Sequence, residues 1–294
     1  MKYNKIYKNP LLAVVFLFQI KIIRTLVSDT IFYKTVYFLR TLNFLNLKKP
    51  ISFNEKINYL KLNDRRPELT DLVDKHSVKE IIRKKIKENI LIPTLGVYEK
   101  YNDIDFNKLP ESFVIKCTHD SGSVWVIENK SEINHDKLSK IIKSNLNKNY
   151  FWLSREWPYK NVIPKILIEK KIGSKKTLLD YKFYCFNGLV KFIHVDIDRY
   201  TNHCRNVYDA SWNYLNMSIE YPTNPSRKIN KPKNLKHMID IASSLSVNHK
   251  FVRVDLFNVE DKIYFGELTF HHGAGYEKFT PERYNTIFGG FINL

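Results

Sequence analysis

Apolar and polar residues alternate in two consecutive segments near the C-terminus, which predicts a β-hairpin over residues 251–270. On the first strand of this hairpin, Arg253 and Asp255 share the polar face. On the second strand, the polar face carries Glu267 and Thr269. The apolar faces are made by Val252, Val254, Leu256, Leu268 and Phe270.

The register of this hairpin follows from the need to bury both apolar faces in one core. Val254 should pair with Leu268 or with a residue two positions away, which sets Asp255 opposite or diagonal to Glu267. Like charges facing each other across a ladder are destabilising, and a hard cation with oxygen ligands between them would remove the repulsion. The pattern therefore predicts a Mg²⁺ site. The alternative is a solvent-facing acid pair without a metal.

The same periodicities predict helices and strands along the rest of the chain. Ser52 and Glu55 have the spacing of a capping box, so a helix should begin there and run to about residue 61. Asn187-Gly188 is a hairpin signal between two strands. Helices are also expected over most of 1–48, over 69–88, in the stretch ending near 159 and over 235–245; strands over 113–117, 124–127, 165–170, 180–186 and 190–196; and irregular structure over 198–233.

Composition limits the classes of function. The chain has 294 residues, of which 44% are hydrophobic, enough for a sizeable core in two or three subdomains. Its formal net charge is +18, but the lysines are spread along the whole length, which favours phosphate-bearing or polyanionic partners over a specific nucleic acid. Three cysteines without a C-x-x-C spacing indicate neither a disulfide framework nor a zinc site, and favour the cytoplasm.

An apolar run over residues 11–20 follows three lysines and ends at Lys21. It is shorter than the roughly 20 residues that a membrane-spanning helix needs. We expect a buried or surface-bound amphipathic helix, with peripheral contact at the inner face of the membrane as the functional variant.

Charged residues also interrupt the apolar strands. Lys116 lies in the middle of the strand over 113–117, where a charge is costly unless it is paired, and the small-residue loop 120–123 begins four residues later. Backbone N–H groups of such a loop can cradle phosphate oxygens, although an ordinary β-turn is the alternative. Lys182 is embedded in a later strand in the same way, and Glu169 lies on the strand before it.

This order of motifs resembles the ATP-grasp superfamily, and more closely the TupA-like ATP-grasp family associated with bacterial surface-polysaccharide gene clusters. The resemblance covers about residue 48 to the end. The matching stretches are 50–56, 74–79, 109–117 with His119 and Ser121-Gly122, 155–157 with Tyr159-Lys160, 180–183, 253–255 and 266–270.

The resemblance implies an α+β ATP-grasp fold, in which two α+β subdomains grip ATP, preceded by a helical extension. The predicted boundaries are 1–48 for the N-terminal helical segment, 49–164 for the region with the small subdomain, and 165–294 for the C-terminal subdomain.

It also implies roles for individual residues. Nucleotide phosphates would meet Lys75, Lys116, Lys182 and the loop with Ser121, Gly122 and Ser123, while adenine would meet a hinge at Glu169 and Lys170. Mg²⁺ would be held by Asp255 and Glu267, with Thr269 where many relatives have Asn, and Arg253 would face the transferred phosphoryl group. Asp120 stands where the family tends to have glycine, and its charge would oppose phosphate unless it points away.

The implied activity is that of an ATP- and Mg²⁺-dependent carboxylate–amine ligase. It would join an amino acid or other amine to a carboxylate-bearing glycan through an acyl phosphate, in capsule or surface-polysaccharide synthesis. His119, His271 and His272 are candidate bases for the amine. The alternatives are a glycosyltransferase of the same pathway and a non-enzymatic basic binding module.

Overall fold

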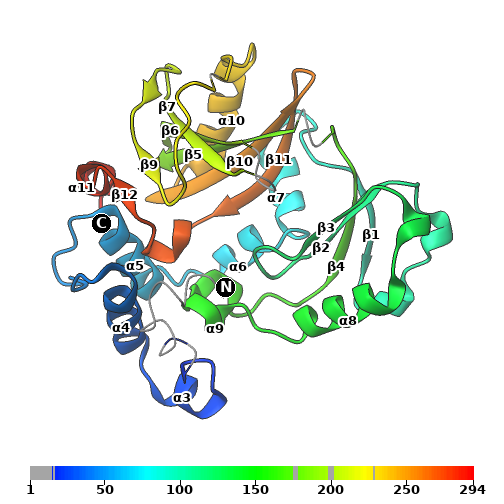
Figure 1. Cartoon of the computed structure of the whole chain (residues 1–294), viewed down its shortest axis with the longest axis horizontal. Coiled ribbons are helices and arrows are strands. Elements are labelled where there is room, and N and C mark those ends of the chain that lie inside the picture. The colour runs from blue at the N-terminus through cyan, green and yellow to red at the C-terminus, as the bar shows by residue number, and fades with distance from the viewer. Residues whose placement is uncertain (1–14, 16, 175–177, 198–201, 228) are drawn as a thin grey trace.

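Two antiparallel sheets form the framework of the protein (Figure 1). The computed structural model describes residues 15, 17–174, 178–197, 202–227 and 229–294. The first sheet has the order β1-β4-β2-β3 and consists of β1 (Thr94–Tyr98), β2 (Phe113–Cys117), β3 (Val124–Ile127) and β4 (Ile166–Lys170). The second has the order β11-β10-β5-β6-β7-β8 and consists of β5 (Leu179–Phe186), β6 (Leu189–Ile197), β7 (Cys204–Asp209), β8 (Tyr214–Leu215), β10 (Phe251–Val259) and β11 (Lys262–Thr269).

A third, two-stranded sheet pairs β9 (Ser218–Ile219) with β12 (Phe279–Thr280). The α-helices are α3 (Lys21–Leu26), α4 (Asp29–Thr41), α5 (Phe53–Asn63), α6 (Glu68–Val73), α7 (Val78–Lys85), α8 (His135–Leu146), α9 (Phe151–Ser154), α10 (Leu235–Ser246) and α11 (Arg283–Gly290). Short 3₁₀ segments are η2 (Tyr101–Asp103), η3 (Phe106–Lys108), η4 (Lys130–Glu132), η5 (Trp157–Tyr159) and η6 (His272–Gly275).

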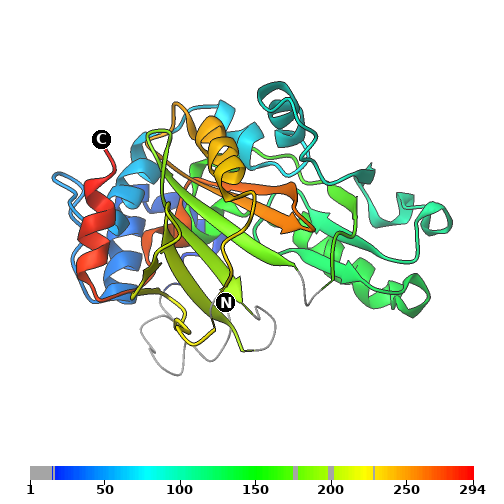
Figure 2. The same cartoon turned by 90° about the horizontal axis from the view of Figure 1, so that it is seen from above.

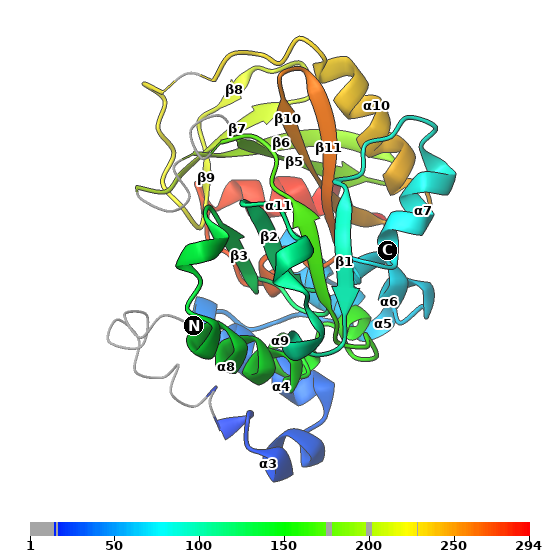
Figure 3. The same ribbon diagram turned by 90° about the vertical axis from the view of Figure 1, so that its right-hand side faces the viewer.

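Helices cover each sheet according to the apolar face that its strands present. Leu138 and Ile142 of α8 pack on Phe113 and Ile115 of the first sheet. The second sheet buries one face against α6, α7 and α10. Figure 2 shows α11 and the blue helices at one end of the molecule and the first sheet at the other, while Figure 3 shows α3 and α10 at opposite extremes.

The opposite face of the second sheet changes character along its strands, and this change positions the site. On β5, Phe186 and the ring of Tyr184 lie in an apolar cluster with Phe53 of α5 and Phe288 of α11. Farther along the same face of β5, Lys182 takes the place of an apolar residue and is buried among polar groups. Because side chains alternate along a strand, one face is thus apolar at one end and charged at the other.

The structure confirms the predicted C-terminal hairpin and its register. Val254 pairs with Leu268, and Asp255 pairs directly with Glu267. A bulge follows Asp255, opposite Gly266, where a Cβ atom would lie 3.0 Å from the Asp255 carbonyl oxygen. The irregularity in the register therefore lies at the acid pair itself, where the tight approach to the neighbouring backbone favours glycine.

Other local predictions are confirmed as well. Ser52 and Glu55 form the capping box that begins α5. Asn187 and Gly188 both have positive φ, 49° and 84°, as the tight turn between β5 and β6 requires. The predicted strands over 113–117 and 124–127 have the bounds of β2 and β3, and the helix over 235–245 corresponds to α10.

Two predictions of secondary structure are wrong in part. The expected single helix over 69–88 is two helices, because the Asp74 carboxylate accepts the backbone N–H groups of His76 and Ser77 and turns the chain. The expected irregular stretch 198–233 contains β7, β8 and β9, although residues 198–201 and 228 lie outside the described part. Arg205 and Asn206 interrupt the apolar pattern of β7 because both are buried on polar partners.

The N-terminal prediction is tested only in part. Residues 1–14 and 16 lie outside the described residues, so most of the predicted helix over 11–20 does too. From Lys21 onward the segment is helical, and α4 buries Phe32, Tyr33 and Val36 beside Tyr276. No helix within the described ranges has the length and apolarity needed to cross a membrane. The thiols of Cys117, Cys185 and Cys204 are buried and unbonded to one another.

Candidate active site

Polar side chains gather on the charged end of the second sheet's inner face, across β6, β5, β10 and β11. The register places Asp255 beside Lys182 on one side and beside Glu267 on the other. The polar members of this face are Asp180, Lys182, His194, Asp196, Arg253, Asp255, Glu267 and Thr269.

Arg253 lies between the two paired acids. Its Nε and Nη2 atoms donate to the two carboxylate oxygens of Asp255 at 2.6 and 2.7 Å, and Nη2 also donates to Glu267 Oε1 at 3.0 Å. Burial would raise the pKa of Glu267, but Arg253, Lys75 and Lys182 outweigh burial and lower it. The guanidinium therefore already offsets the repulsion between the two acids, and the predicted Mg²⁺ site stays a prediction.

Lys182 is buried among three aspartates. Its ammonium contacts the carboxylate of Asp180, and lies 3.3 Å from Asp255 Oδ2 and 3.5 Å from Asp196 Oδ2. Burial favours the neutral amine, but the three carboxylates outweigh it and raise the pKa of Lys182. A fixed positive charge therefore stands beside the acid pair.

The donor set at the acid pair fits a magnesium ion. Within the described ranges, no group of three or more His, Cys, Asp or Glu side chains is placed to hold a metal alone. Mg²⁺, however, is usually bound by one or two carboxylates together with substrate phosphates and water. The surrounding network holds five carboxylates against three cations and so carries two net negative charges; its members are Asp180, Asp196, Asp255, Glu267 and Glu277 with Lys182, Arg205 and Arg253.

Thr269 is the next residue after Glu267 on the same face of β11. Its hydroxyl donates to Glu267 Oε1 at 3.3 Å. The hydroxyl oxygen keeps its lone pairs, so the side chain both orients the glutamate and offers a neutral oxygen beside it.

A second charged cluster lies on the first sheet. Lys116 on β2 and Glu169 on the neighbouring β4 form an ion pair with 2.6 Å between Nζ and Oε2. Lys79 of α7 contacts the other oxygen of Glu169 and also donates to the carbonyl of Ile92 at 2.9 Å. Lys170 follows Glu169 on β4, and its exposed side chain does not join this cluster because alternate residues face opposite sides.

The loop 120–123 links the two clusters. Lys75 donates to the carbonyl oxygen of Asp120. Burial lowers the pKa of Lys75, and the Glu267 carboxylate is the largest influence opposing that shift. The Asp120 carboxylate accepts the hydroxyl of Ser123 and so points into the loop rather than out of it. Gly122 has φ of 106°, which a residue with a side chain rarely adopts. The exposed loop edge is thus Ser121-Gly122, without the acidic group.

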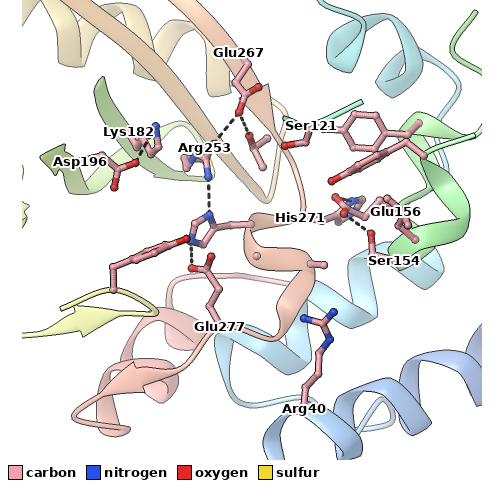
Figure 4. Close-up of a pocket in the computed structure, with 18 of the residues that line it drawn as sticks. Arg40, Ser121, Ser154, Glu156, Lys182, Asp196, Arg253, Glu267, His271 and Glu277 are labelled. Carbon is pink, nitrogen blue, oxygen red and sulfur yellow. Dashed lines mark hydrogen bonds and ion pairs between the residues drawn. The ribbon is translucent and has the colours of Figure 1, made fainter. Parts of the chain in front are cut away.

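A cavity of about 710 Å³ opens beside the loop and the second sheet (Figure 4). Five predicted site residues line it: Ser121, Lys182, Arg253, Glu267 and Thr269. The first-sheet cluster of Lys116 and Glu169 lies outside this lining, as do Lys75 and Asp255. The structure therefore groups the predicted residues into a chamber and a separate cluster on the first sheet, connected through the loop.

The candidate histidines have different surroundings. His119 is buried, and its Nε2 lies 3.1 Å from two backbone carbonyls at the end of α8, which is a structural position. The Nδ1 atom of His272 accepts from Arg253 at 2.8 Å, so this nitrogen carries no proton. Its Nε2 faces Glu277 Oε2 at 2.7 Å, and burial lowers the pKa of the ring. His271 faces the chamber, which His272 also lines.

Several chamber residues were not predicted from the sequence. Asp196 could have been found, because it alternates with apolar residues on β6 as Lys182 does on β5. Lys79, in the cluster on the first sheet rather than in the chamber, lies in a matching stretch but was not among the predicted site residues. The others come from segments without a strand period and gave no such signal: Arg40, Glu156, His203, Arg205 and Glu277.

The chain is similar to one protein family and to several solved structures. The family model described as TupA-like ATPgrasp matches residues 55–293. No curated protein matches the sequence. Similar solved structures include D-alanine–D-alanine ligase from Bacillus anthracis complexed with ATP, with 17% identity over 69% of this chain and 57% of that one and a TM-score of 0.42. An L-amino acid ligase from Bacillus licheniformis has 12% identity over 79% of this chain and 50% of that one, with a TM-score of 0.45. The chain thus spans little more than half the length of these proteins.

Proposed function

Because the chain belongs to the TupA-like ATP-grasp family, we propose that it is an ATP-dependent carboxylate–amine ligase. The observation that carries this proposal is the array of Arg253, Lys182 and the paired acids Asp255 and Glu267 at the wall of the chamber. Such an array places fixed charges of both signs where a phosphoryl group and a divalent cation would meet.

In the proposed reaction, the γ-phosphoryl group of ATP passes to a substrate carboxylate, and an amine then displaces phosphate to give an amide. Arg253 and Lys182 would stabilise negative charge on the transferred group, because their guanidinium and ammonium are held in place before the substrate arrives. Asp255, Glu267 and the Thr269 hydroxyl would hold Mg²⁺, which supplies charge neutralisation at the phosphates. No covalent intermediate on the protein is needed.

The nucleotide would lie toward the first sheet. Lys116 and Lys75, with the loop Ser121–Ser123, would meet the phosphates, and Glu169 and Lys170 would form the adenine hinge. The pairing of Glu169 with both Lys79 and Lys116 supports this placement, because two cations held by one buried carboxylate offer a preformed anion site at the edge of β4. Lys79 therefore joins the proposed set.

The proposed substrates are a uronic-acid-containing glycan as the carboxylate and an amino acid or other amine as the nucleophile, in capsule or surface-polysaccharide synthesis. The resemblance in sequence motifs supports this choice. The rival is a glycosyltransferase of the same pathway, which would release a nucleotide from a sugar donor rather than ADP from ATP.

We place the protein in the cytoplasm, where ATP is available and thiols stay reduced, with a peripheral contact to the membrane. Large apolar side chains on the N-terminal helical region are exposed, Ile22 by 70%, Leu26 by 80% and Phe44 by 85%. Together with the net charge of +18, these side chains suit an anionic lipid surface.

Product analysis tests the ligase. The protein is incubated with ATP, Mg²⁺, a panel of uronic acids and hydroxylamine, which intercepts an acyl phosphate as a hydroxamate. We expect ADP and hydroxamate to form together and only when a carboxylate is present. Release of UDP from a sugar nucleotide, with no ADP under any combination of acceptors, would overturn the ligase in favour of the glycosyltransferase.

A further inference from the structure

The chamber extends beyond Lys182, Arg253 and Glu267. From Arg253 and Glu267 it continues between η6, the corner that joins α9 to η5, and the N-terminal helix α4 (Figure 4). This end carries a carboxylate, an imidazole and a guanidinium that the phosphoryl-transfer array does not contain: Glu156, His271 and Arg40.

Glu156 is a fixed carboxylate in the chamber wall. It is 6% exposed, and its Oε1 accepts the hydroxyl of Ser154 at 2.6 Å. Burial would raise its pKa, but His271, Ser154 and the ammonium of Lys61 outweigh burial and lower it. A carboxylate that is buried yet ionised favours a cationic group beside it.

His271 completes the pair. It is 3% exposed, its Nδ1 lies 3.7 Å from Glu156 Oε2, and this nitrogen has no hydrogen-bond partner among the described residues. The distance is too long for a hydrogen bond, so the Nδ1 atom and the carboxylate oxygen can both face a bound ammonium group. His271 follows Thr269 of β11 by two residues, so the pair stands next to the phosphoryl-transfer array.

Arg40 comes from a part of the chain outside the matched family region. It lies at the end of α4, points toward the chamber in Figure 4, and packs its guanidinium on the ring of Tyr276 at 5.2 Å. Within the described ranges this guanidinium has no carboxylate partner. The segment is held by Arg155, which precedes Glu156 and bonds to Asp29 and to the carbonyls of Val27 and Arg24.

We propose that this end of the chamber is the amine site, and that it takes an amine that also carries a carboxylate. The ammonium group binds between Glu156 and His271, and the carboxylate binds to Arg40. This inference rests on the proposed ligase function and assigns its second substrate to residues on the opposite side of the chamber from Lys182.

Glu156 also positions the nitrogen for the reaction. The bound ammonium first releases a proton to the solvent in the chamber, while the Glu156 carboxylate holds the nitrogen in place. The free amine attacks the acyl carbon, forming the C–N bond while the C–O bond to phosphate breaks. The nitrogen's second surplus proton leaves with the phosphate, so the products are an amide and hydrogen phosphate.

The test compares two nucleophiles on the Glu156→Gln variant, with ATP, Mg²⁺ and a uronic acid that gives hydroxamate with the wild type. Hydroxylamine needs no deprotonation at neutral pH, so hydroxamate formation should stay within about threefold of the wild type. Amide formation with glycine, L-alanine or L-glutamate should fall by about a hundredfold or more. Hydroxamate formation by the variant also shows that the variant is folded.

Substrate charge is tested with the same amino acids and their α-carboxamides. The wild type should prefer the free carboxylates by about tenfold or more in kcat/KM, and Arg40→Ala should remove this preference. Lys34→Ala, an exposed change on the same helix outside the chamber lining, should retain it.

Two results would overturn the amine site alone: undiminished amide formation in Glu156→Gln, or equal use of carboxamides and amino acids by the wild type. A wild type that gives no hydroxamate with any uronic acid would overturn the ligase and the amine site together.

Discussion

Arg253 organises the chemistry of the chamber at the scale of single residues. Its guanidinium donates hydrogen bonds to both carboxylate oxygens of Asp255 and to one oxygen of Glu267. A fourth hydrogen bond, to Nδ1 of His272, fixes the tautomer of that ring. The two acids are unequal partners, because the side chain of Asp255 is 5% exposed and that of Glu267 is 36% exposed. The same guanidinium therefore forms one deeply buried ion pair and one that borders the solvent.

This inequality predicts different effects for Asp255→Asn and Glu267→Gln. Both variants should lose at least about a hundredfold of Mg²⁺-dependent ATP turnover. Asp255→Asn should cost about 3 kcal/mol of unfolding free energy, since it leaves a buried guanidinium without its bidentate partner, whereas Glu267→Gln should cost below about 1 kcal/mol. Urea unfolding without metal measures both. Equal costs, or wild-type turnover in both, would contradict the assignment.

Lys116→Met tests the cluster on the first sheet. Its ammonium is expected to meet phosphate charge rather than adenine, so the change should weaken ATP by roughly 1.5 to 3 kcal/mol, or about ten- to a hundredfold, and AMP by much less. Calorimetric titration with each nucleotide measures the difference. Equal losses for ATP and AMP would point to misfolding or to another role.

Sequence reasoning identified the polar residues of the sheet and, at the chamber's far end, His271, but it missed Glu156 and Arg40. The alternation along β10 and β11 is a local property, so Arg253, Asp255 and Glu267 could be assigned to one face without knowledge of the fold. Glu156 and Arg40 come from a helix corner and from a distant helix. Their convergence depends on tertiary packing, which no local pattern encodes.

At the scale of elements, strand bounds were predicted well where apolar residues alternate and poorly where buried polar residues replace them. β7 was missed because Arg205 and Asn206 find their partners on β6 and on the chain around residue 224. The break between α6 and α7 was missed because a single side chain, that of Asp74, turns the backbone.

Helix α5 links the two walls of the amine end through one buried lysine. Lys61 is fully buried, donates to the Ala274 carbonyl at 2.8 Å, and lies 3.4 Å from the Ser154 carbonyl. The same ammonium lies over the rings of Tyr33 and Tyr276. Burial lowers the pKa of Lys61 to about 7.

The lowered pKa of Lys61 predicts a pH dependence of stability. Between pH 7 and about 10.5 the unfolded chain binds a proton at Lys61 that the folded protein does not, so the folded state gains stability as pH rises and loses it as pH falls through 7. The unfolding free energy of the wild type minus that of Lys61→Met should therefore increase by roughly 2 kcal/mol from pH 6.5 to pH 9. A difference that stays constant with pH would show that the amine is charged throughout.

At the scale of the whole molecule, the family match confirms the α+β ATP-grasp fold that the ordered motifs implied. Several short motifs in a fixed order identify such a fold even where helix ends are misjudged. The two domain boundaries at residues 48/49 and 164/165 stay predictions, as does the role of the first 48 residues.

The exposed apolar side chains of the N-terminal region predict binding to anionic membranes. The wild type should sediment with vesicles that contain phosphatidylglycerol and not with phosphatidylcholine vesicles, and salt should weaken the binding. Ile22→Ser with Leu26→Ser should reduce binding about tenfold or more, because two large apolar groups no longer enter the interface. Val247→Ser, an exposed apolar change elsewhere, serves as the matched control. Unchanged binding of the double variant would exclude this surface.

The reactivity of the three buried cysteines can report transient opening of the two sheets. Cys117 lies in the first sheet, while Cys185 and Cys204 lie in the second. Burial raises the pKa of Cys117 and of Cys185 to about 12, so neither sulfur is a thiolate in the closed protein. An alkylating reagent can modify these sulfurs only while the surrounding strands separate, and its rate follows the population of such openings. The alkylation rate of Cys117 therefore reports opening of the first sheet, and the rates of Cys185 and Cys204 report opening of the second, without an engineered label.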